Sequence, residues 1–317
     1  MEIQIDYINY ERGGRPNANY SGDGGLPDPT GLVRIMLSGS WPAILGVGEA
    51  ERWEFNGYQG AYEAAVALRR AGGPPYVPFV GSLPREGGPF GPAILVDPTA
   101  VEVHRWYDHR LGDFGSRNRN LLVCSIPGRS EVFRVLITHG DIHDGNQRLA
   151  DAMTFDRFAD PEIPCVILGD WNSTLSGPMW EVGDWNNPDP MMHQPHRRAH
   201  KIMFLHGPRQ AGPHVADTRA LDYLCGFWTP GRRLWLRRRP ARRVGGIGFY
   251  DVAELEGDYT PTQYPHPFGR PPRTIDRALV NRPLRDAYVR GSYRVHDPLD
   301  PSCPDSDHKR ISFVLDM

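Results

Sequence analysis

The chain has little cysteine, and the arrangement of the few cysteines narrows its class. Its 317 residues include four of them, which are widely scattered at positions 124, 165, 225 and 303. A disulfide framework or a zinc site normally shows closer, paired spacing, so the sequence favours neither. We expect reduced, mostly buried thiols and a cytoplasmic location.

Long apolar runs and repeats are also lacking. No stretch approaches the roughly 20 apolar residues that a helix needs to cross a bilayer. Met1 to Tyr10 lacks the basic region and apolar core of a secretory signal. No heptad pattern, internal repeat or Pro/Gly/Ser-rich linker divides the chain. These absences predict one domain over residues 1–317 with no membrane span, and nothing in the sequence indicates an obligate protein partner.

Net charge and lysine are scarce as well. The 36 basic and 38 acidic residues leave a formal charge of −2, so no global field attracts a polyanion. Lys201 and Lys309 are the only lysines, which makes arginine the default base of the chain. Affinity for nucleic acid must then come from a local patch, and the clearest one is the segment from Arg232 to Arg243.

This arginine segment supplies candidate substrate-binding residues, which are Arg232, Arg233, Trp235, Arg237 and Arg238. Guanidinium groups bind phosphate in a bidentate manner and an indole stacks on a base, so the segment suits a nucleic acid or another polyphosphate. An equally weighted alternative is a solvated face, or ion pairs with nearby acids such as Asp251, Glu254 and Glu256. The sequence leaves both interpretations open.

Two short motifs at predicted strand ends carry the strongest functional signal. The apolar run Ile167 to Gly169 ends in Asp170-Trp171-Asn172, and Ser306-Asp307-His308 stands directly before the last apolar strand. Strand ends can hold side chains rigidly against a cleft. Carboxylate, amide and imidazole groups in such positions suit a hard metal ion and a phosphate.

Other predicted strands each carry one polar residue at or near an end. These are Asn9 in 3–9, Glu49 after 43–48, His139 in 132–139 and Asp276 in 273–280. A single Asp or Asn after a strand is more often a turn former than a ligand, because its side chain bonds nearby backbone amides. Turn chemistry gives no reason for all these groups to follow one another on successive strands, so we interpret them as one functional set.

In these segments the chain resembles the endonuclease/exonuclease/phosphatase superfamily, which includes DNase I-like nucleases, abasic-site endonucleases, inositol polyphosphate 5-phosphatases, neutral sphingomyelinases and deadenylases. The matching segments are Tyr7-Ile8-Asn9-Tyr10, Gly48-Glu49, Ile137-Thr138-His139, Gly169-Asp170-Trp171-Asn172, Thr274-Ile275-Asp276-Arg277 and Ser306-Asp307-His308. They span nearly the whole chain. The resemblance implies an α/β fold, namely a four-layer α/β/β/α sandwich with two packed mixed or antiparallel sheets.

The chain departs from the family pattern in three places. The family usually has a Gln before its metal-binding Glu, and here Gly48 stands in that position, which predicts altered surroundings for Glu49. An apolar residue usually follows the Thr-His pair, and here Gly140 follows it. The stretch between Asn172 and Asp276 is longer than a minimal member needs. We expect an insertion around 176–272 that determines the substrate.

The resemblance also implies metal-assisted hydrolysis of a phosphoester. Glu49, with Asn9 nearby, would hold Mg²⁺ or Mn²⁺, because hard cations take oxygen ligands. Asp307 would be a second metal ligand or would support the first ones. A His at position 139 is shared with the DNase I-like nucleases, phosphoinositide phosphatases and sphingomyelinases, whereas abasic-site endonucleases differ there. It could donate a hydrogen bond or a proton near the leaving oxygen.

The remaining motif residues have implied roles at the reacting phosphate. Asp170 would orient and help to deprotonate the attacking water, and Asn172 would bond a non-bridging phosphate oxygen. His308 would contact the same phosphate or act in proton transfer, with Asp276 fixing its tautomer. Together with His139, these four are the predicted catalytic residues.

Helices are expected between the strands. Tyr58 to Arg70 is Ala-rich and ends before a Gly-Gly-Pro stop signal, and Asn146 to Ala159 carries spaced apolar residues. Pro-rich Tyr259 to Pro272 is expected to form an ordered surface loop. Alternating strands and helices of this kind fit the implied sandwich.

Three functions from different classes stay open. The first is a metal-dependent phosphodiesterase or nuclease acting on DNA or RNA. The second is a phosphatase or phosphodiesterase of a small phosphorylated metabolite or a lipid head group. The third is a non-catalytic interaction protein on the same scaffold, and the presence of every catalytic-type residue argues against it.

Overall fold

The computed structural model describes residues 1–14, 27–82, 91–108, 120–180, 202–204, 214–234, 237–265, 272–302 and 304–317. Cys303, Trp235 and parts of the predicted insertion therefore lie outside the described residues. The other three cysteines, Cys124, Cys165 and Cys225, are buried free thiols, which confirms the expectation for them. No helix in the described ranges is both long and apolar enough to cross a membrane.

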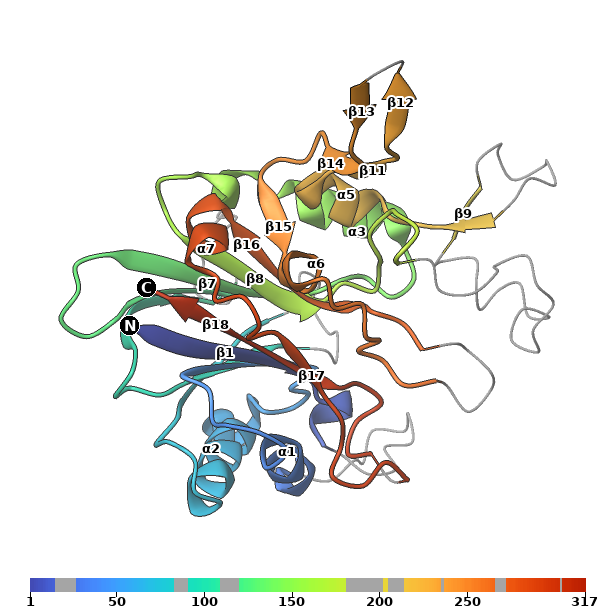
Figure 1. Cartoon of the computed structure of the whole chain (residues 1–317). Coiled ribbons are helices and arrows are strands. Elements are labelled where there is room, and N and C mark those ends of the chain that lie inside the picture. The colour runs from blue at the N-terminus through green and yellow to red at the C-terminus, as the bar shows by residue number, and fades with distance from the viewer. Residues whose placement is uncertain are drawn as a thin grey trace.

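Two six-stranded sheets form the centre of the molecule (Figure 1). The first has the order β17 (Arg294–His296), β18 (Arg310–Asp316), β1 (Glu2–Asn9), β2 (Ile44–Gly48), β4 (Ala93–Val96) and β3 (Val77–Val80). The second has the order β15 (Phe249–Asp251), β16 (Asp276–Asn281), β8 (Cys165–Asp170), β7 (Val132–His139), β6 (Leu121–Ser125) and β5 (Glu102–Tyr107). Each sheet is mixed, because β1–β2 and β7–β8 are parallel and the other neighbours are antiparallel. The expected pair of packed mixed sheets is confirmed.

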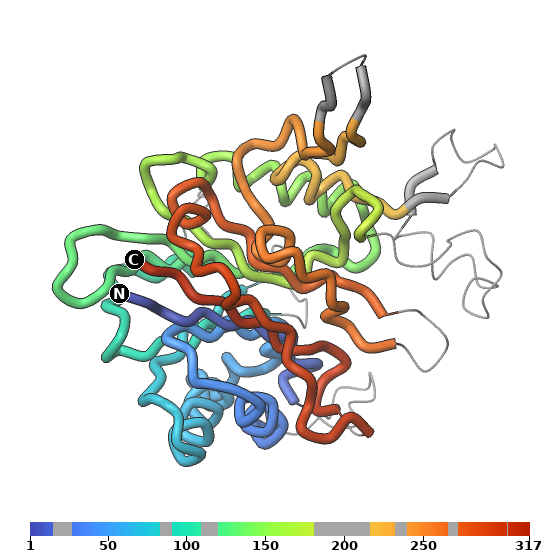
Figure 2. Tube along the Cα trace, viewed as in Figure 1, coloured from blue at the N-terminus to red at the C-terminus, as the bar shows by residue number. Residues whose placement is uncertain are grey.

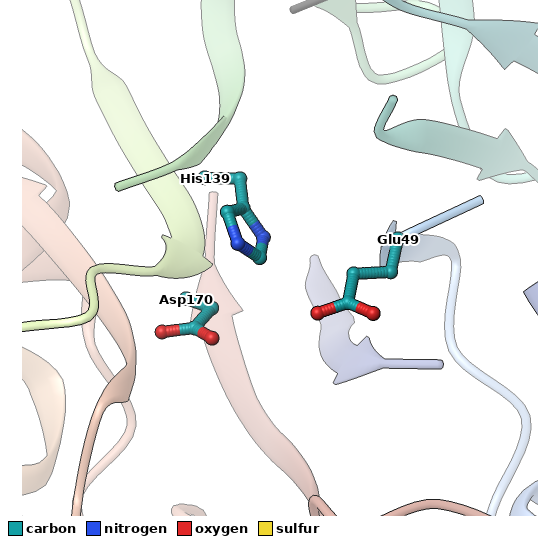
Figure 3. A group of neighbouring side chains, drawn as sticks. All are labelled: Glu49, His139 and Asp170. Atoms are coloured by element: carbon teal, nitrogen blue, oxygen red, sulfur yellow. The ribbon is translucent and has the colours of Figure 1, made fainter. Parts of the chain in front are cut away.

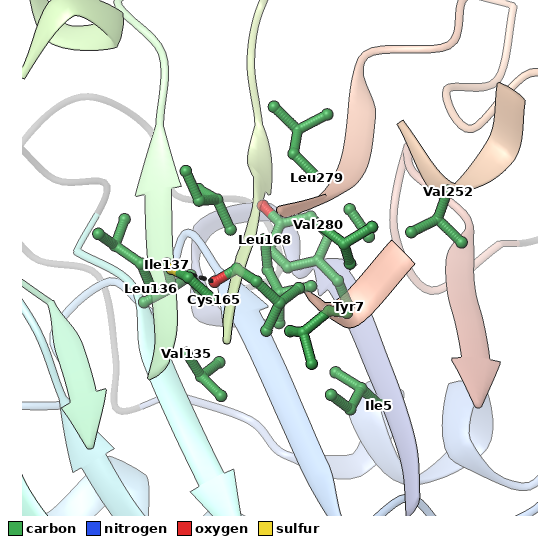
Figure 4. Close-up of a cluster of buried hydrophobic side chains, with 14 of the residues drawn as sticks. Ile5, Tyr7, Val135, Leu136, Ile137, Cys165, Leu168, Val252, Leu279 and Val280 are labelled. Carbon is green, nitrogen blue, oxygen red and sulfur yellow. Dashed lines mark hydrogen bonds between the residues drawn. The ribbon is translucent and has the colours of Figure 1, made fainter. Parts of the chain in front are cut away.

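The main core lies between the two sheets. Ile5 and Tyr7 of β1 belong to the same buried cluster as Ile137 of β7 and Leu168 of β8 (Figure 4). Every residue of β8 is buried, which explains why its sequence is a continuous apolar run rather than an alternating one. Burial of each large aliphatic side chain stabilises the fold by about 1.5–3 kcal/mol relative to its exposure.

Helices cover the outer faces of the sheets (Figure 1). The helices α1 (Thr30–Met36) and α2 (Phe55–Arg70) pack on the first sheet. A short helix η1 (Glu11–Gly13) follows β1. The other helices of the described residues are α3 (Gly145–Met153), η3 (Asp156–Ala159), α5 (Arg219–Cys225), α6 (Val252–Glu256) and α7 (Arg282–Ala287). A second buried cluster joins β1, β2 and β4 to α1 and α2. The predicted helix Tyr58 to Arg70 is confirmed. The bounds of α2 also include Phe55 to Gly57, but Asn56, Gly57 and Tyr58 have positive φ, so the regular helix begins after Tyr58.

The predicted helix from Asn146 to Ala159 is wrong in its length. It divides into α3 and η3, with Thr154 and Phe155 between them. The Thr154 hydroxyl donates to the carbonyl of Asp151, and the Phe155 ring packs edge-on against Trp171 at 6.0 Å between ring centroids. Packing on the second sheet thus interrupts a pattern that is periodic in the sequence.

The long stretch before β16 adds small elements at one side of the second sheet (Figure 1). They are the strand pairs β9 (Ile202–Phe204) with β10 (His214–Ala216), β11 (Phe227–Thr229) with β14 (Arg242–Val244), and β12 (Arg232–Leu234) with β13 (Arg237–Arg239). The two chain ends lie side by side at the opposite end of the sheets (Figure 2). The amino group of Met1 donates to Asp316 Oδ1 at 2.8 Å, because β1 and β18 pair along their length.

The strand directions bring the motif residues to one edge of the sandwich. Asn9 and His139 end β1 and β7, and Asp170 ends β8 beside His139 in the parallel register. Asp276 begins β16 and pairs with Asp170 in the antiparallel register. His308 stands two residues before β18, which pairs with β1. Residues from the first and last strands therefore meet at this edge.

Candidate active site

Asn9 lies at the centre of the site. Its Nδ2 donates to Glu49 Oε1 at 3.1 Å and to Asp170 Oδ2 at 3.2 Å, and it lies 3.5 Å from His308 Nε2. Within the described residues, Asn9 Oδ1 is buried and has no hydrogen-bond partner. The side chain of Asn9 thus links the ends of three strands and keeps an amide oxygen available for a ligand.

Glu49, His139 and Asp170 face one another from three different strand ends (Figure 3). Each offers one ligand atom, and these atoms lie within 4.8 Å of one another. The backbone of Glu49 has a positive φ of 54°, and its Oε2 accepts the backbone N–H of Arg12 at 3.2 Å. A non-glycine residue in this conformation is uncommon, and at a strand end it turns the carboxylate toward the other two side chains.

Asn172 belongs to the same edge. Its backbone N–H donates to Asp170 Oδ1 at 2.7 Å, and its Nδ2 donates to the carbonyl of Gly140 at 3.2 Å. The same Nδ2 lies 3.3 Å from His139 Nε2. Asn172 also has a positive φ of 46°, which reverses the chain after Asp170. The Gly-Asp-x-Asn motif therefore delivers two polar side chains from one tight turn.

Asp276 and His308 form a buried pair, with 2.7 Å between Asp276 Oδ2 and His308 Nδ1. Burial raises the pKa of Asp276 to about 6, against the lowering influence of His308. Burial disfavours the charged imidazole, but Asp276, Asp307 and Asp170 outweigh this and raise the pKa of His308 to about 10. Asp276 holds Nδ1, so the Nε2 atom of His308 faces the site.

The Ser306-Asp307-His308 motif is anchored by its serine. The Ser306 hydroxyl donates to the carbonyl of Asn9 at 2.6 Å and accepts the backbone N–H of His308 at 3.2 Å. Asp307 is half exposed, and its Oδ1 lies 3.6 Å from His308 Nε2. In the described chain, two groups of acidic and imidazole residues are close enough to share a metal ion, and Asp307 belongs to neither. One is Glu49, His139 and Asp170, and the other is Asp170, Asp276 and His308.

Two further residues at the site were missed from the sequence. Gln263 Nε2 lies 3.3 Å from His308 Nε2, and Gln263 Oε1 accepts from the guanidinium of Arg273 at 3.0 Å. The phenol oxygen of Tyr7 accepts the backbone N–H of Asp170 at 2.8 Å. Gln263 stands in the Pro-rich segment without any motif around it. Tyr7 belongs to the matching segment Tyr7-Ile8-Asn9-Tyr10, but the sequence indicates no role for it, although its spacing of two from Asn9 places both side chains on the same face of β1.

The donor set fits a hard divalent cation. Carboxylate and amide oxygens from Glu49, Asp170 and Asn9 converge there, and these are the ligand types that Mg²⁺ and Mn²⁺ prefer. Negative charge is also concentrated here. Burial, and then the neighbouring carboxylates of Asp307 and Glu49, raise the pKa of Glu11. A bound cation would relieve this repulsion and would engage the buried oxygen of Asn9.

Arg232, Arg233, Arg237 and Arg238 lie in a narrow antiparallel ribbon, β12 with β13, that projects beyond the β11–β14 pair (Figure 1). Arg232 and Arg233 of β12 pair through the backbone with Arg239 and Arg238 of β13, and Arg237 pairs with Leu234. Trp235 lies outside the described residues. At the base of the ribbon, Arg243 forms ion pairs with Glu254 and Asp222, so the ion-pair interpretation holds for this arginine.

Similar folds occur in several solved structures. The catalytic domain of human Nocturnin, solved with a bound sulfate anion, has a TM-score of 0.54 at 12% identity and covers 99% of this chain and 92% of that one. An endonuclease/exonuclease/phosphatase family protein from Bacteroides thetaiotaomicron has a TM-score of 0.55 at 13% identity, over 99% and 97%. TDP2 from D. rerio, solved as a complex with single strand DNA product, has a TM-score of 0.51 at 14% identity, over 100% and 99%.

No family model matches the chain, and no curated protein matches it in sequence. At these identities the comparisons establish the fold alone. The chain has the fold of the endonuclease/exonuclease/phosphatase superfamily, as its motifs predicted. What it catalyses must be argued from its own site.

Proposed function

We propose that the protein is a hydrolase of phosphoester bonds that depends on Mg²⁺ or Mn²⁺. The observation that carries this proposal is the convergence of seven motif residues from distant strands on one edge of the sandwich. They are Asn9, Glu49, His139, Asp170, Asn172, Asp276 and His308. Their sequence separation reaches 299 positions for the Asn9–His308 contact, so local turn chemistry does not account for the cluster.

Glu49 and Asn9 would hold the cation, with Asp170 beside them. When bound, the cation supplies Lewis-acid polarisation of a phosphate oxygen. Asp307 is half exposed and is suited to supporting this group from the solvent side. The same carboxylates would keep an anionic substrate away in the absence of the metal, since like charges repel.

The chemical step would use residues of the second sheet and the last loop. Asp170 accepts a proton from the attacking water, and its carboxylate is oriented by the backbone N–H of Asn172 and the side-chain amide of Asn9. Asn172 Nδ2 donates one hydrogen to the Gly140 carbonyl, and its second hydrogen would be donated to a non-bridging oxygen as charge develops there. His308, held through Nδ1 by Asp276, presents Nε2 to the phosphate, and His139 is available at the leaving oxygen.

We propose a nucleic acid as the substrate, bound through the insertion around 176–272 within a single domain. The support is the arginine-rich sequence of β12 and β13, which contains Arg232, Arg233, Arg237 and Arg238 and pairs into a projecting ribbon. The complex of D. rerio TDP2 with single strand DNA product indicates that this fold accommodates such a polymer. The alternative substrate is a small phosphorylated metabolite or lipid head group, which would not need the ribbon.

The test is Mg²⁺-dependent cleavage of single- and double-stranded DNA, RNA and a panel of small phosphomonoesters and phosphodiesters, with EDTA as one control. Glu49→Gln removes a charged ligand at the site, and Glu63→Gln on α2, which bonds only to Gln59 among the described contacts, is the matched control. We expect cleavage that EDTA and Glu49→Gln abolish and Glu63→Gln retains.

Turnover of small phosphoesters alone would replace the nucleic-acid proposal by the alternative. Silence on every substrate, combined with no detectable Mn²⁺ binding by calorimetry, would overturn the proposal of a metal-dependent hydrolase. Metal binding without turnover of any substrate would favour the non-catalytic scaffold.

A further inference from the structure

The tyrosine Tyr7 lies directly beneath the candidate site and is fully buried at 0% exposure. It stands two residues before Asn9 on β1, so both side chains point to the inner face of the first sheet. Its phenol oxygen accepts the backbone N–H of Asp170 at 2.8 Å across the gap between the two sheets. Tyr7 therefore joins the strand that carries Asn9 to the strand that carries Asp170.

Two glycines of the neighbouring strand β2 make room for this tyrosine. In the parallel register, Tyr7 is opposite Gly46 and Asn9 is opposite Gly48. A Cβ atom on Gly46 would lie 3.1 Å from Tyr7 Cδ2. A Cβ atom on Gly48 would lie 2.3 Å from the phenol oxygen, which is far inside contact distance. Glycine is unfavourable within a strand and often marks a close approach, and here the approach is that of the Tyr7 ring.

The same geometry relates Tyr7 to the metal-binding edge. The missing Cβ of Gly48 would also lie 3.1 Å from Asn9 Oδ1, the buried oxygen that has no hydrogen-bond partner within the described residues. Gly48 directly precedes Glu49. The phenol oxygen thus occupies the space that a side chain at position 48 would fill, beside Asn9 and next to Glu49.

We propose that Tyr7 is a positioning residue that stands in for a side chain at position 48, and that it orients Asn9, Glu49 and Asp170 for metal binding. This inference rests on the proposed function. It also explains why Gly48 departs from the family pattern. The polar group that the family places on β2 is replaced here by the Tyr7 hydroxyl, which reaches the same space from β1. A phenol can both accept and donate a hydrogen bond, as a carboxamide does.

The test compares Tyr7→Phe with Tyr76→Phe. Tyr76 is also buried, and its hydroxyl donates to the carbonyl of Pro42 at 2.8 Å, so the control loses a buried hydroxyl of similar kind away from the site. Calorimetry should show that Tyr7→Phe binds Mn²⁺ about 10-fold more weakly than the native chain. Its kcat should fall about 10-fold with little change in KM. Loss of a group that orients metal ligands typically lowers metal affinity or activity by about 10–100-fold. Hydrogen exchange at the Asp170 amide should be faster in Tyr7→Phe alone.

A second comparison tests the exchange itself. Gly48→Gln should weaken Mn²⁺ binding, because its side chain meets the Tyr7 hydroxyl. In the Tyr7→Ala background, Gly48→Gln should instead bind Mn²⁺ more tightly than either single variant. Mn²⁺ affinity and Asp170 exchange in Tyr7→Phe equal to those of Tyr76→Phe would overturn this inference alone. A native chain that binds no Mn²⁺ would overturn it together with the proposed function.

Discussion

His308 Nδ1 lies 2.7 Å from Asp276 Oδ2, and the two side chains are brought together from the last loop and from β16 of the second sheet. Because one ring nitrogen is held in this way, the other is directed toward Asn9 and Asp170. The pair therefore orients an imidazole at the centre of a strongly acidic site.

We predict that His308→Ala lowers kcat by about 100-fold or more, since a positioned acid–base group typically contributes 10²–10⁴-fold. Asp276→Asn should produce a smaller loss, because the amide keeps the shape but not the charge that supports the ring. The measurement is steady-state turnover of the substrate found in the cleavage panel. His104→Ala, which removes an imidazole bonded to Ser125 on the edge strand β5, is the control. Activity of His308→Ala within about threefold of the control would contradict the assigned role.

The arginine ribbon should contribute to polymer binding and not to the chemical step. Replacing Arg232, Arg233, Arg237 and Arg238 by Ser should raise KM for a nucleic acid. It should also reduce the slope of log affinity against log salt concentration, because each phosphate contact releases about one counterion from the nucleic acid and the variant makes fewer such contacts. Turnover of a small phosphodiester should not change. The matched control is Arg69→Ser with Arg70→Ser at the exposed end of α2. An unchanged salt slope would favour the small-substrate alternative.

A buried ion pair joins the neighbouring strands β15 and β16 of the second sheet. Arg277 Nη1 lies 2.7 Å from Asp251 Oδ2, both side chains are buried, and the guanidinium lies over the ring of Trp180. Arg277→Met should lower the free energy of unfolding by about 3–5 kcal/mol, because Asp251 is left as a buried, unpaired charge. Adding Asp251→Asn should recover part of the loss. Urea denaturation measures both, and a double variant less stable than Arg277→Met would argue against this account.

The Asp6 carboxylate, buried on the helix-facing side of the first sheet, should make stability depend on pH. Burial raises the pKa of Asp6 to about 7, against the lowering influence of Arg310, whose Nε lies 3.6 Å away. A raised acid pKa stabilises the folded state below about pH 4, and this contribution is lost as pH rises to about 7. Asp6→Asn removes this titrating carboxyl. Between about pH 4 and pH 7, the free energy of unfolding of the variant should therefore rise relative to that of the native chain by on the order of 4 kcal/mol, because one pKa unit corresponds to about 1.4 kcal/mol.

His296, next to Arg310, should have the opposite effect on the pH dependence of stability. Burial and then the charge of Arg310 lower the pKa of His296 to about 4. Its contribution is present above about pH 6.5 and is lost as pH falls toward 4, so the Asp6→Asn variant should lose stability on acidification. Thermal unfolding from pH 4 to 8 separates the two groups, with the exposed Asp286→Asn as control. Parallel profiles for Asp6→Asn and the native chain would show that Asp6 is not the titrating group.

Much of the architecture was predictable because it is encoded locally. The strand from Val132 to His139 was predicted with the bounds that the structure has, and β1, β2 and β8 follow from apolar runs that end in a polar residue. An Ala-rich run and the stop signal after it predicted α2 to within three residues. The helix expected from 146 to 159 was wrong because its periodicity continues through a segment where packing against Trp171 ends the helix.

The sequence predicted which residues form the site, but it did not predict the hydrogen bonds between them. The sequence by itself determined which strands end in Asn, His and Asp, since strand ends and turn chemistry depend on neighbouring residues. Only the tertiary structure decided that Tyr7 reaches the amide of Asp170, 163 positions away, through the space at Gly48, and that Gln263 contacts His308. Such contacts depend on how two sheets pack face to face, and the alternation of residues along one strand carries no information about the side chains that meet across the gap.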